Sequence, residues 1–194
     1  MENTPQVLEL KTPRLALEPL ERRHAALLFE TLSDTAIYTF IPFDPPKSVE
    51  TLAERYERLQ VGRSANEKEI WLNFALRKLE GNVYLGTVQA TITGKRAFVA
   101  YELGPRHWGQ GYAGEAVRAL VGHLFSSYGL VPKPAEGVEV IRAETDTRND
   151  RSAALLKRLG FACIERKETA DFFKGSPSHE FIYELQREPW DVLA

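Results

Sequence analysis

The spacing of apolar residues changes several times along the chain, and each change marks a predicted element. Residues 14–20 alternate apolar and polar positions, which is typical of a half-buried strand. Apolar residues then recur at helical spacing, first at Ala25, Leu28, Phe29 and Leu32 and again at Leu52, Tyr56 and Leu59. We therefore expect one strand followed by two helices, with the proline-rich residues 41–48 as the loop between the helices.

The pattern from residue 70 onward predicts a set of antiparallel strands. Three runs, "IWLNFALRK", "VYLGTVQATIT" and "AFVAYELG", have strand character and are separated by turn-forming residues. Within the second run the apolar phase slips between Leu85 and Val88, which predicts a bulge near Gly86.

The C-terminal half alternates helices with strands. Apolar residues at three- and four-residue steps predict a helix that begins inside a glycine-rich stretch and runs to about Ser127. A strand over 138–146 follows, then a helix with Asn149 as its N-cap that ends at Gly160, and two final strands. The order β, α, α, β, β, β, α, β, α, β, β predicts an α/β (α+β) fold in one domain over residues 1–194.

Composition excludes several functional classes. The 194 residues are 43% hydrophobic and carry a net charge of -2, and no segment concentrates lysine and arginine, so we expect no nucleic-acid partner. A secretion signal and an apolar run long enough to span a membrane are both missing, and the one cysteine, Cys163, cannot form an internal disulfide. We expect a cytoplasmic protein, without a metal site, in which Cys163 is a buried spectator thiol.

The stretch "RHWGQGYAGEA" carries the strongest chemical signal. Gly109, Gly111 and Gly114 match the GxGxxG spacing of dinucleotide-binding loops, and Glu144 ends the next strand, where a ribose-binding acid would lie. A dinucleotide fold, however, places these glycines directly after its first strand, whereas here four predicted strands and two helices precede them. Backbone N–H groups before a helix favour an anion, so we expect a phosphorylated ligand over residues 108–114.

A family resemblance gives that ligand an identity. "RHWGQGYA" resembles the [Q/R]-x-x-G-x-[G/A] pyrophosphate loop of the Gcn5-related N-acetyltransferases (GNAT). Together with "LKTPRLALEPLERRHA" and "TDTRNDRSAALLKRLGF", it resembles the subgroup of ribosomal-protein alanine N-acetyltransferases, the RimJ/RimL type. The resemblance implies a mixed, mostly antiparallel sheet of about seven strands flanked by four helices, with strands four and five splayed around acetyl-CoA.

The resemblance also assigns residues to acetyl-CoA. Backbone amides of the glycine loop would bind the pyrophosphate, with Arg106 at the loop's entry and Asn149 at the pantetheine arm. A solvated surface position for Arg106 and a simple helix cap for Asn149 are the alternatives. The full set is Leu103, Arg106, Trp108, Gly109, Gln110, Gly111, Tyr112, Ala113, Gly114, Asn149 and Ser152.

Acetyl transfer to an amine needs a base, a polarised thioester carbonyl and a proton for the leaving thiolate. Glu102 is the first candidate for the base because Phe98 and Ala100 share its strand face, so a carboxylate stands where an apolar residue would continue the pattern. His107 is a weaker candidate. A main-chain N–H within residues 102–104 could polarise the carbonyl.

The proton donor is expected in the "NDRS" segment. Many relatives carry a tyrosine at the position that Leu156 occupies here, which leaves that source of the proton in doubt. By resemblance, Ser152 of the N-x-x-S pattern supplies a hydroxyl near the sulfur instead. Its alternative is an ordinary serine in the first turn of a helix.

The acceptor is less readable. By resemblance its pocket would include aromatic and acidic side chains from three regions, namely Tyr38, Phe40, Phe43, Asp44, Trp71 and Phe172 or Phe173. A protein N-terminus, an amino acid, an aminoglycoside-like compound or a polyamine could each be the amine, and a non-catalytic acyl-CoA-binding module is the alternative function. A homodimer is open as well, because the C-terminal "EPWDVLA" could contact a partner or cover the core.

Overall fold

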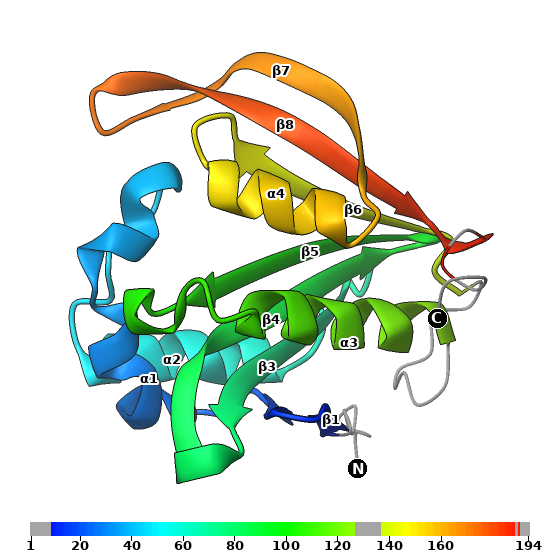
Figure 1. Ribbon diagram of the computed structural model, residues 1–194. Helices are drawn as coiled ribbons and strands as arrows, with labels where there is room; N and C mark the ends of the chain where they lie inside the picture. Colours follow the sequence, from blue (N-terminus) through cyan, green and yellow to red (C-terminus); the bar gives the residue numbers. More distant parts are fainter. Residues whose placement is uncertain (1–8, 127–136, 189, 191–194) are drawn as a thin grey trace.

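The computed structural model describes residues 9–126, 137–188 and 190 (Figure 1). Helices and strands alternate largely in the predicted order. The strands are β1 (Leu10–Lys11), β2 (Leu15–Pro19), β3 (Ile70–Lys78), β4 (Val83–Thr93), β5 (Arg96–Leu103), β6 (Val140–Asp146), β7 (Ala162–Phe173) and β8 (Ser176–Gln186). The α-helices are α1 (His24–Leu32), α2 (Val49–Gln60), α3 (Tyr112–Ser126) and α4 (Asp150–Arg158), with 3-10 turns η1 (Thr35–Phe40), η2 (Glu80–Asn82) and η3 (Pro105–His107).

All eight strands form one sheet, in the order β1-β2-β3-β4-β5-β6-β8-β7. Only the β5–β6 pair is parallel, so the expectation of a mixed, mostly antiparallel sheet is confirmed. Eight strands are present where about seven were expected, because the two-residue β1 was not predicted. Helices α1 and α2 cover one face of the sheet, while α3 and α4 cover the other (Figure 1).

The sheet opens between β5 and β6. Residues Arg96–Phe98 pair with Val140–Arg142, and no further pair joins the two strands. Beyond these pairs β5 and β6 diverge, as Figure 1 shows, and both strands run on toward the N-terminal ends of α3 and α4. The predicted splay is therefore confirmed, and it leaves one edge of β5 without a hydrogen-bonded neighbour beside the glycine loop.

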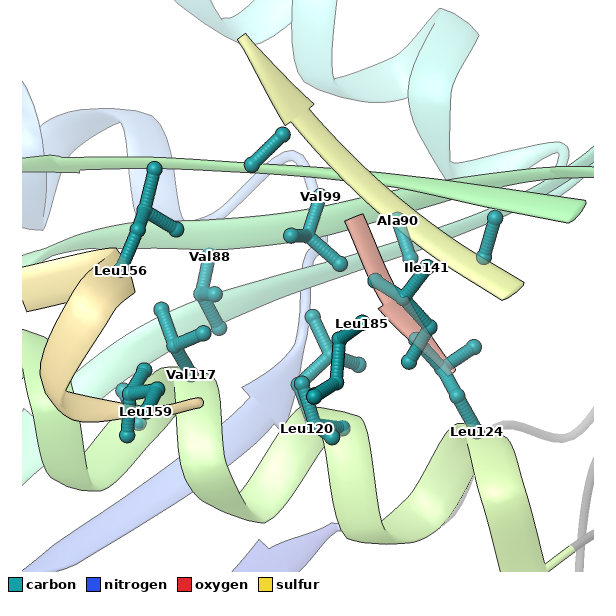
Figure 2. Close-up of a cluster of buried hydrophobic side chains, with 14 of the residues drawn as sticks. Val88, Ala90, Val99, Val117, Leu120, Leu124, Ile141, Leu156, Leu159 and Leu185 are labelled. Atoms are coloured by element: carbon teal, nitrogen blue, oxygen red, sulfur yellow. The ribbon is translucent and has the colours of Figure 1, made fainter. Parts of the chain in front are cut away.

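The larger core lies on the α3 and α4 face (Figure 2). Val117, Leu120 and Leu124 recur along one side of α3 and are fully buried against β4, β5 and β6. Leu156 of α4 lies in the same cluster. Burying a side chain of this size stabilises the fold by about 1.5–3 kcal/mol, so this face fixes both helix N-termini relative to the splay.

A buried polar network fastens α1 to the opposite face. The Glu18 carboxylate accepts hydrogen bonds from Arg77 (2.5 Å) and Tyr84 (2.9 Å) and lies 3.1 Å from His24 Nε2. His24 Nδ1 accepts from the Glu21 backbone N–H, so the ring proton is on Nε2 and points at Glu18. Burial opposes the charge of Glu18, but these hydrogen bonds, led by that from Arg77, lower its pKa to about 2.

The predicted bulge at Gly86 is confirmed. The pairing of β3 with β4 shifts between Leu76 and Arg77, which places one extra residue in β4. Gly86 has φ 151°, and a Cβ atom there would lie 1.9 Å from the Glu102 carbonyl oxygen. Only glycine fits this approach of β4 to β5.

The structure bears on two statements about the C-terminal part, the burial of Cys163 and the role of the last residues. Cys163 is exposed, so the prediction of a buried thiol was wrong. It lies on the edge strand β7, where most side chains remain exposed. Trp190, in contrast, is buried and stacks near Phe125 at a ring distance of 6.3 Å, so this residue of the C-terminal segment covers the core. None of the described helices is long and apolar enough to cross a membrane.

Candidate functional site

The glycine loop between β5 and α3 presents a row of unused hydrogen-bond donors. Gly109 and Gly111 adopt positive φ angles of 74° and 83°, which turn the chain sharply before α3 begins at Tyr112. Among the described residues, none accepts a hydrogen bond from the backbone N–H groups of residues 109–114. These donors and the positive end of the helix dipole form a cradle that fits a pyrophosphate.

Side chains on both ends of the loop hold this shape. Trp108 Nε1 donates to the Leu103 carbonyl at 2.7 Å, which ties the loop to the end of β5. Gln110 Nε2 donates to the Arg106 carbonyl at 2.8 Å. The Arg106 side chain is exposed and makes no hydrogen bond or ion pair with the described residues, which leaves both interpretations of it open.

The N-terminal segment braces the loop from outside, a contact that the sequence did not reveal. Arg14 donates from Nη1 to the Gln110 carbonyl at 3.0 Å and from Nε to Glu115 at 2.6 Å, and its guanidinium lies over the Tyr112 ring. Thr12 also donates to Glu115. Burial would raise the pKa of Glu115, but these hydrogen bonds lower it, so the carboxylate stays charged.

Helix α4 begins on the other side of the splay. The Asn149 side chain accepts from the Ser152 backbone N–H at 3.1 Å, which confirms Asn149 as the N-cap. The Ser152 hydroxyl lies 2.7 Å from the Tyr101 hydroxyl of β5. Leu156 points into the core and is 1% exposed. Tyr101 was missed because its β-strand position reads as apolar core.

Glu102 follows Tyr101 in β5 and lies on the opposite face of the sheet, because side chains alternate along a strand. Burial raises its pKa, with a smaller opposing effect from Arg55, and the carboxylate makes no hydrogen bond or ion pair to any described residue. Phe98 and Ala100 do share its face, as expected. They are exposed, however, so the face is not the apolar surface that the prediction assumed.

The next residue of β5, Leu103, has a free backbone donor. Gly104 N–H donates to Leu85 of β4, so Leu103 N–H, one residue earlier in the extended strand, points to the opposite edge. That edge is the one from which β6 has diverged. Leu103 is thus the residue of 102–104 whose N–H is placed to polarise a carbonyl in the splay.

A cavity of about 370 Å³ opens under α2, on the Glu102 face. Thr87 pairs with Glu102 in the β4–β5 ladder, and Asn73 pairs with Gln89 in the β3–β4 ladder, so these four polar side chains form its floor. Residues of α2 and of the loop before it form the wall. A second cavity of about 510 Å³ adjoins it, between the η1 region and the β7–β8 hairpin, and includes Arg148, Phe173 and Lys174.

The predicted acceptor residues divide into two groups. Tyr38 and Asp44 line both cavities. Of the alternatives Phe172 and Phe173, Phe173 lines the second cavity. Phe40, Phe43, Trp71 and Phe172 line neither, and Phe43 and Phe172 are 60% and 67% exposed. Trp71 donates its indole N–H to Glu69 at 3.0 Å.

Sequence reasoning missed the residues that α2 and β3 contribute to the cavity. Tyr56 was counted among the apolar core positions of α2, and Asn73 and Gln89 fall on the polar phase of their strands. Only the register of β3 against β4 shows that Asn73 and Gln89 lie side by side under α2.

The remaining base candidate, His107, lies beside the glycine loop. Partial burial, with Lys78 and Arg106 nearby, lowers its pKa. Within the described residues no group of histidine, cysteine and carboxylate side chains could hold a metal ion.

Comparison with known proteins places this geometry in a family. A model of the acetyltransferase (GNAT) domain matches residues 14–162. The uncharacterized N-acetyltransferase p20 of Bacillus licheniformis is 28% identical over 158 residues, covering 78% of this chain and 81% of that protein. An FsC-acetyl coenzyme A-N(2)-transacetylase of Aspergillus fumigatus is 28% identical over 194 residues, covering 93% and 77%.

A solved structure shares the fold. The ribosomal L7/L12 alpha-N-protein acetyltransferase RimL, solved in complex with coenzyme A, superimposes with a TM-score of 0.77 at 17% identity, over 92% of this chain and 98% of that one. The domain match spans most of the chain, including the glycine loop and the N-terminus of α4. The chain belongs to the GNAT family and is an acetyltransferase.

Proposed function

We propose that the protein is an acetyl-CoA-dependent N-acetyltransferase that moves the acetyl group directly to a primary amine bound under α2. The observation that carries the proposal is the position of Glu102, an unpaired carboxylate that faces the cavity from the part of β5 that β6 no longer accompanies. A partly buried acid without a partner is costly to stability, and such groups are concentrated at functional sites.

The two faces of β5 divide the proposed reaction. The glycine loop and Asn149 would hold acetyl-CoA on the α3 and α4 side, where the bound thioester supplies an activated acetyl group. The amine would approach from the α2 side. Tyr101 and Glu102 are adjacent in β5 and point to opposite faces of the sheet. The Tyr101 hydroxyl group therefore lies on the cofactor side of the splay between β5 and β6, and the Glu102 carboxylate lies on the acceptor side.

Glu102 would take a proton from the acceptor. An amine with a pKa of about 8–10 is mostly protonated at neutral pH, so it must lose a proton before its nitrogen can attack. The raised pKa of Glu102 makes the carboxylate a better proton acceptor than an exposed glutamate. As the nitrogen–carbon bond forms, Leu103 N–H would stabilise the charge that develops on the carbonyl oxygen.

Ser152 would donate a proton to the thiolate that leaves when the carbon–sulfur bond breaks. Its hydroxyl is held by Tyr101, and its backbone by the Asn149 cap. With Leu156 in place of a tyrosine, the α4 side of the splay still carries a hydroxyl group, that of Ser152. As for the acceptor, RimL, whose fold this chain shares, is named as an acetyltransferase of a ribosomal protein, so a protein N-terminal amine is one candidate beside small-molecule amines.

Two measurements on the same samples test the proposal. Acetyl-CoA at one hundred times its dissociation constant should stabilise the fold by about 2.7 kcal/mol. Thiol release against peptide N-termini, amino acids, aminoglycosides and polyamines should then identify the acceptor class. Stabilisation by NAD but not by acetyl-CoA, or stabilisation without thiol release from any amine, would contradict the proposal.

A further inference from the structure

The cavity under α2 contains polar atoms that the protein itself does not satisfy. Tyr56 is 3% exposed and its hydroxyl group has no hydrogen-bond partner, and the same holds for Asn73 Nδ2. Of the described residues, only one other has such a buried side-chain atom, His123 in α3. Buried polar groups are normally paired, so two such groups that line one cavity and have no partner within the protein are available to a polar ligand there.

The unpaired donors favour a ligand with oxygen atoms. The Asn73 amide nitrogen can only donate, and the Tyr56 hydroxyl can donate as well as accept. Burial, and to a smaller extent the charge of Glu102, raises the pKa of Tyr56, so this hydroxyl keeps its proton and lies within electrostatic reach of the carboxylate. The interior of the cavity therefore combines one acid with two donors.

Three cations surround the opening of the same cavity. Lys47 precedes α2, and Arg55 and Arg58 lie one helical turn apart on it, so their side chains share one face. None of the three side chains forms an ion pair or a hydrogen bond with the described residues. Arginine without a partner at a cavity rim is suited to carboxylate or phosphate, which accept its paired N–H donors.

Two of the cations and one of the acids come from different elements. Arg55 and Arg58 lie on α2 and Glu102 lies on β5, whereas Lys47 and Asp44 both belong to the loop between η1 and α2. Arg55 lies near enough to influence the pKa of Glu102, yet no ion pair within 4.0 Å joins them. A small molecule with a positive and a negative group could place one on each.

We propose that the acceptor is a primary amine that also carries an anionic group, a carboxylate or a phosphate. Its amine lies at Glu102, its oxygen atoms meet Tyr56 and Asn73, and its anionic group meets Arg55 and Arg58. This inference rests on the proposed function, which it deepens, and it excludes polyamines and aminoglycosides, whose several positive charges would meet the cations at the rim.

Matched pairs of amines test the inference by binding, apart from turnover. Calorimetric titrations of the protein saturated with coenzyme A would compare β-alanine with β-alaninamide and phosphoethanolamine with ethanolamine. We expect the anionic member of at least one pair to bind tenfold or more tightly than its neutral partner. The pair that shows the preference identifies carboxylate or phosphate as the recognised group.

Arg55→Gln and Arg58→Gln should each reduce that affinity ratio at least threefold. The matched control is Arg22→Gln, since Arg22 is an exposed cation that pairs with Glu57 on α2 and does not line the cavity. A ratio near one for both pairs in the wild type, or a ratio that Arg22→Gln changes as much as Arg55→Gln does, would overturn the inference.

Thiol release separates this inference from the proposed function. Turnover of neutral amines with no preference for anionic ones would leave the acetyltransferase activity intact and remove the anionic acceptor. Preferential binding of anionic amines without thiol release would support the binding site and contradict the assigned chemistry.

Discussion

The hydroxyl groups of Tyr101 and Ser152 lie 2.7 Å apart and join β5 to α4 across the splayed part of the sheet. No strand pairing joins β5 to β6 there, because the β5–β6 ladder ends at Phe98. Burial raises the pKa of Tyr101, with a smaller opposing effect of Ser152, so both hydroxyls remain protonated at neutral pH. When Ser152 donates its proton, the Tyr101 hydroxyl group is therefore placed to supply another.

Removal of the Ser152 hydroxyl should slow acetyl transfer while acetyl-CoA still binds. We expect Ser152→Ala to lower kcat by about 100-fold, in the range of general acid catalysis. Tyr101→Phe removes only the second member of the pair, and the loss of one hydrogen bond corresponds to about a fivefold decrease. Steady-state kinetics and the affinity for acetyl-CoA would be measured in parallel. Ser126→Ala, at an exposed serine of α3, serves as the control, and an unchanged kcat in Ser152→Ala would contradict the assignment.

The pH dependence of the rate should reflect Glu102. The base must be unprotonated, and burial raises its pKa above 4.5, so the rate should increase with pH through this raised value. Glu102→Gln should lower kcat by about 100-fold and abolish that increase. Initial rates measured between pH 5 and about pH 9 would show it. The low-pH decrease would have to belong to another group if the Gln variant retained it.

The same substitution should stabilise the protein at neutral pH. A raised pKa means that the folded state binds the proton more tightly than the unfolded state, so stability is highest below the unfolded pKa and falls as pH rises through the folded one. Glu102→Gln removes this penalty, and we expect a gain on the order of 1 kcal/mol at pH 7 that disappears in acid. Urea unfolding at both pH values measures it. Equal stability of the two proteins at pH 7 would mean that Glu102 is well solvated.

The Glu18 network should behave in the opposite way. Its pKa is lowered to about 2, so its stabilisation is present above the unfolded value of about 4.3 and is lost as pH falls toward 2. Glu18→Gln leaves Arg77 without its charged partner, and we expect a loss of about 3 kcal/mol at pH 7.

An exposed ion pair provides the comparison for Glu18. Arg22 and Glu57 are 54% and 64% exposed, so Glu57→Gln should change stability by less than about 1 kcal/mol. Unfolding in urea at pH 7 and at low pH would be compared for both variants. A similar, small effect of the two substitutions would show that the buried network contributes no more than a surface pair.

The Arg14 brace should affect cofactor affinity more than turnover. Arg14→Ala removes the hydrogen bond to the Gln110 carbonyl and the contacts with Glu115, so the glycine loop loses its external support. We expect the Kd for coenzyme A to rise about tenfold, equivalent to about 1.4 kcal/mol, with kcat at saturation nearly unchanged. Lys11→Ala, in the same segment and exposed, is the control. Titration calorimetry would measure both, and equal affinities would show that the loop holds its shape unaided.

The sequence was sufficient for most of the fold because each element carries its own local signal. The helical spacing of Leu120 and Leu124 predicts α3, and the Asn149 cap predicts the start of α4. The phase slip before Val88 predicts the bulge. What failed depends on neighbours that no local pattern reports, such as the exposure of Cys163 on an edge strand.

The candidate site was predicted only in part, for a similar reason. The glycine loop is contiguous, so its residues are readable from one stretch. Arg14 and Glu115, by contrast, are 101 positions apart, and Tyr56 and Asn73 line one cavity only because α2 packs on the sheet beside β3. Phe43 and Phe172 were selected by resemblance, which does not determine whether an aromatic side chain on a loop or an edge strand turns inward.

The bulge at Gly86 has a consequence for how β4 is used. In a regular strand Tyr84 and Thr87 would lie on opposite faces, since three positions separate them. The extra residue cancels this alternation, so Tyr84 reaches Glu18 while Thr87 lies on the floor of the cavity beside Glu102. One strand thereby serves two polar sites on the same face. Deletion of a single residue at the bulge would restore the regular alternation, so either Tyr84 or Thr87 would turn to the opposite face of the sheet and leave its site.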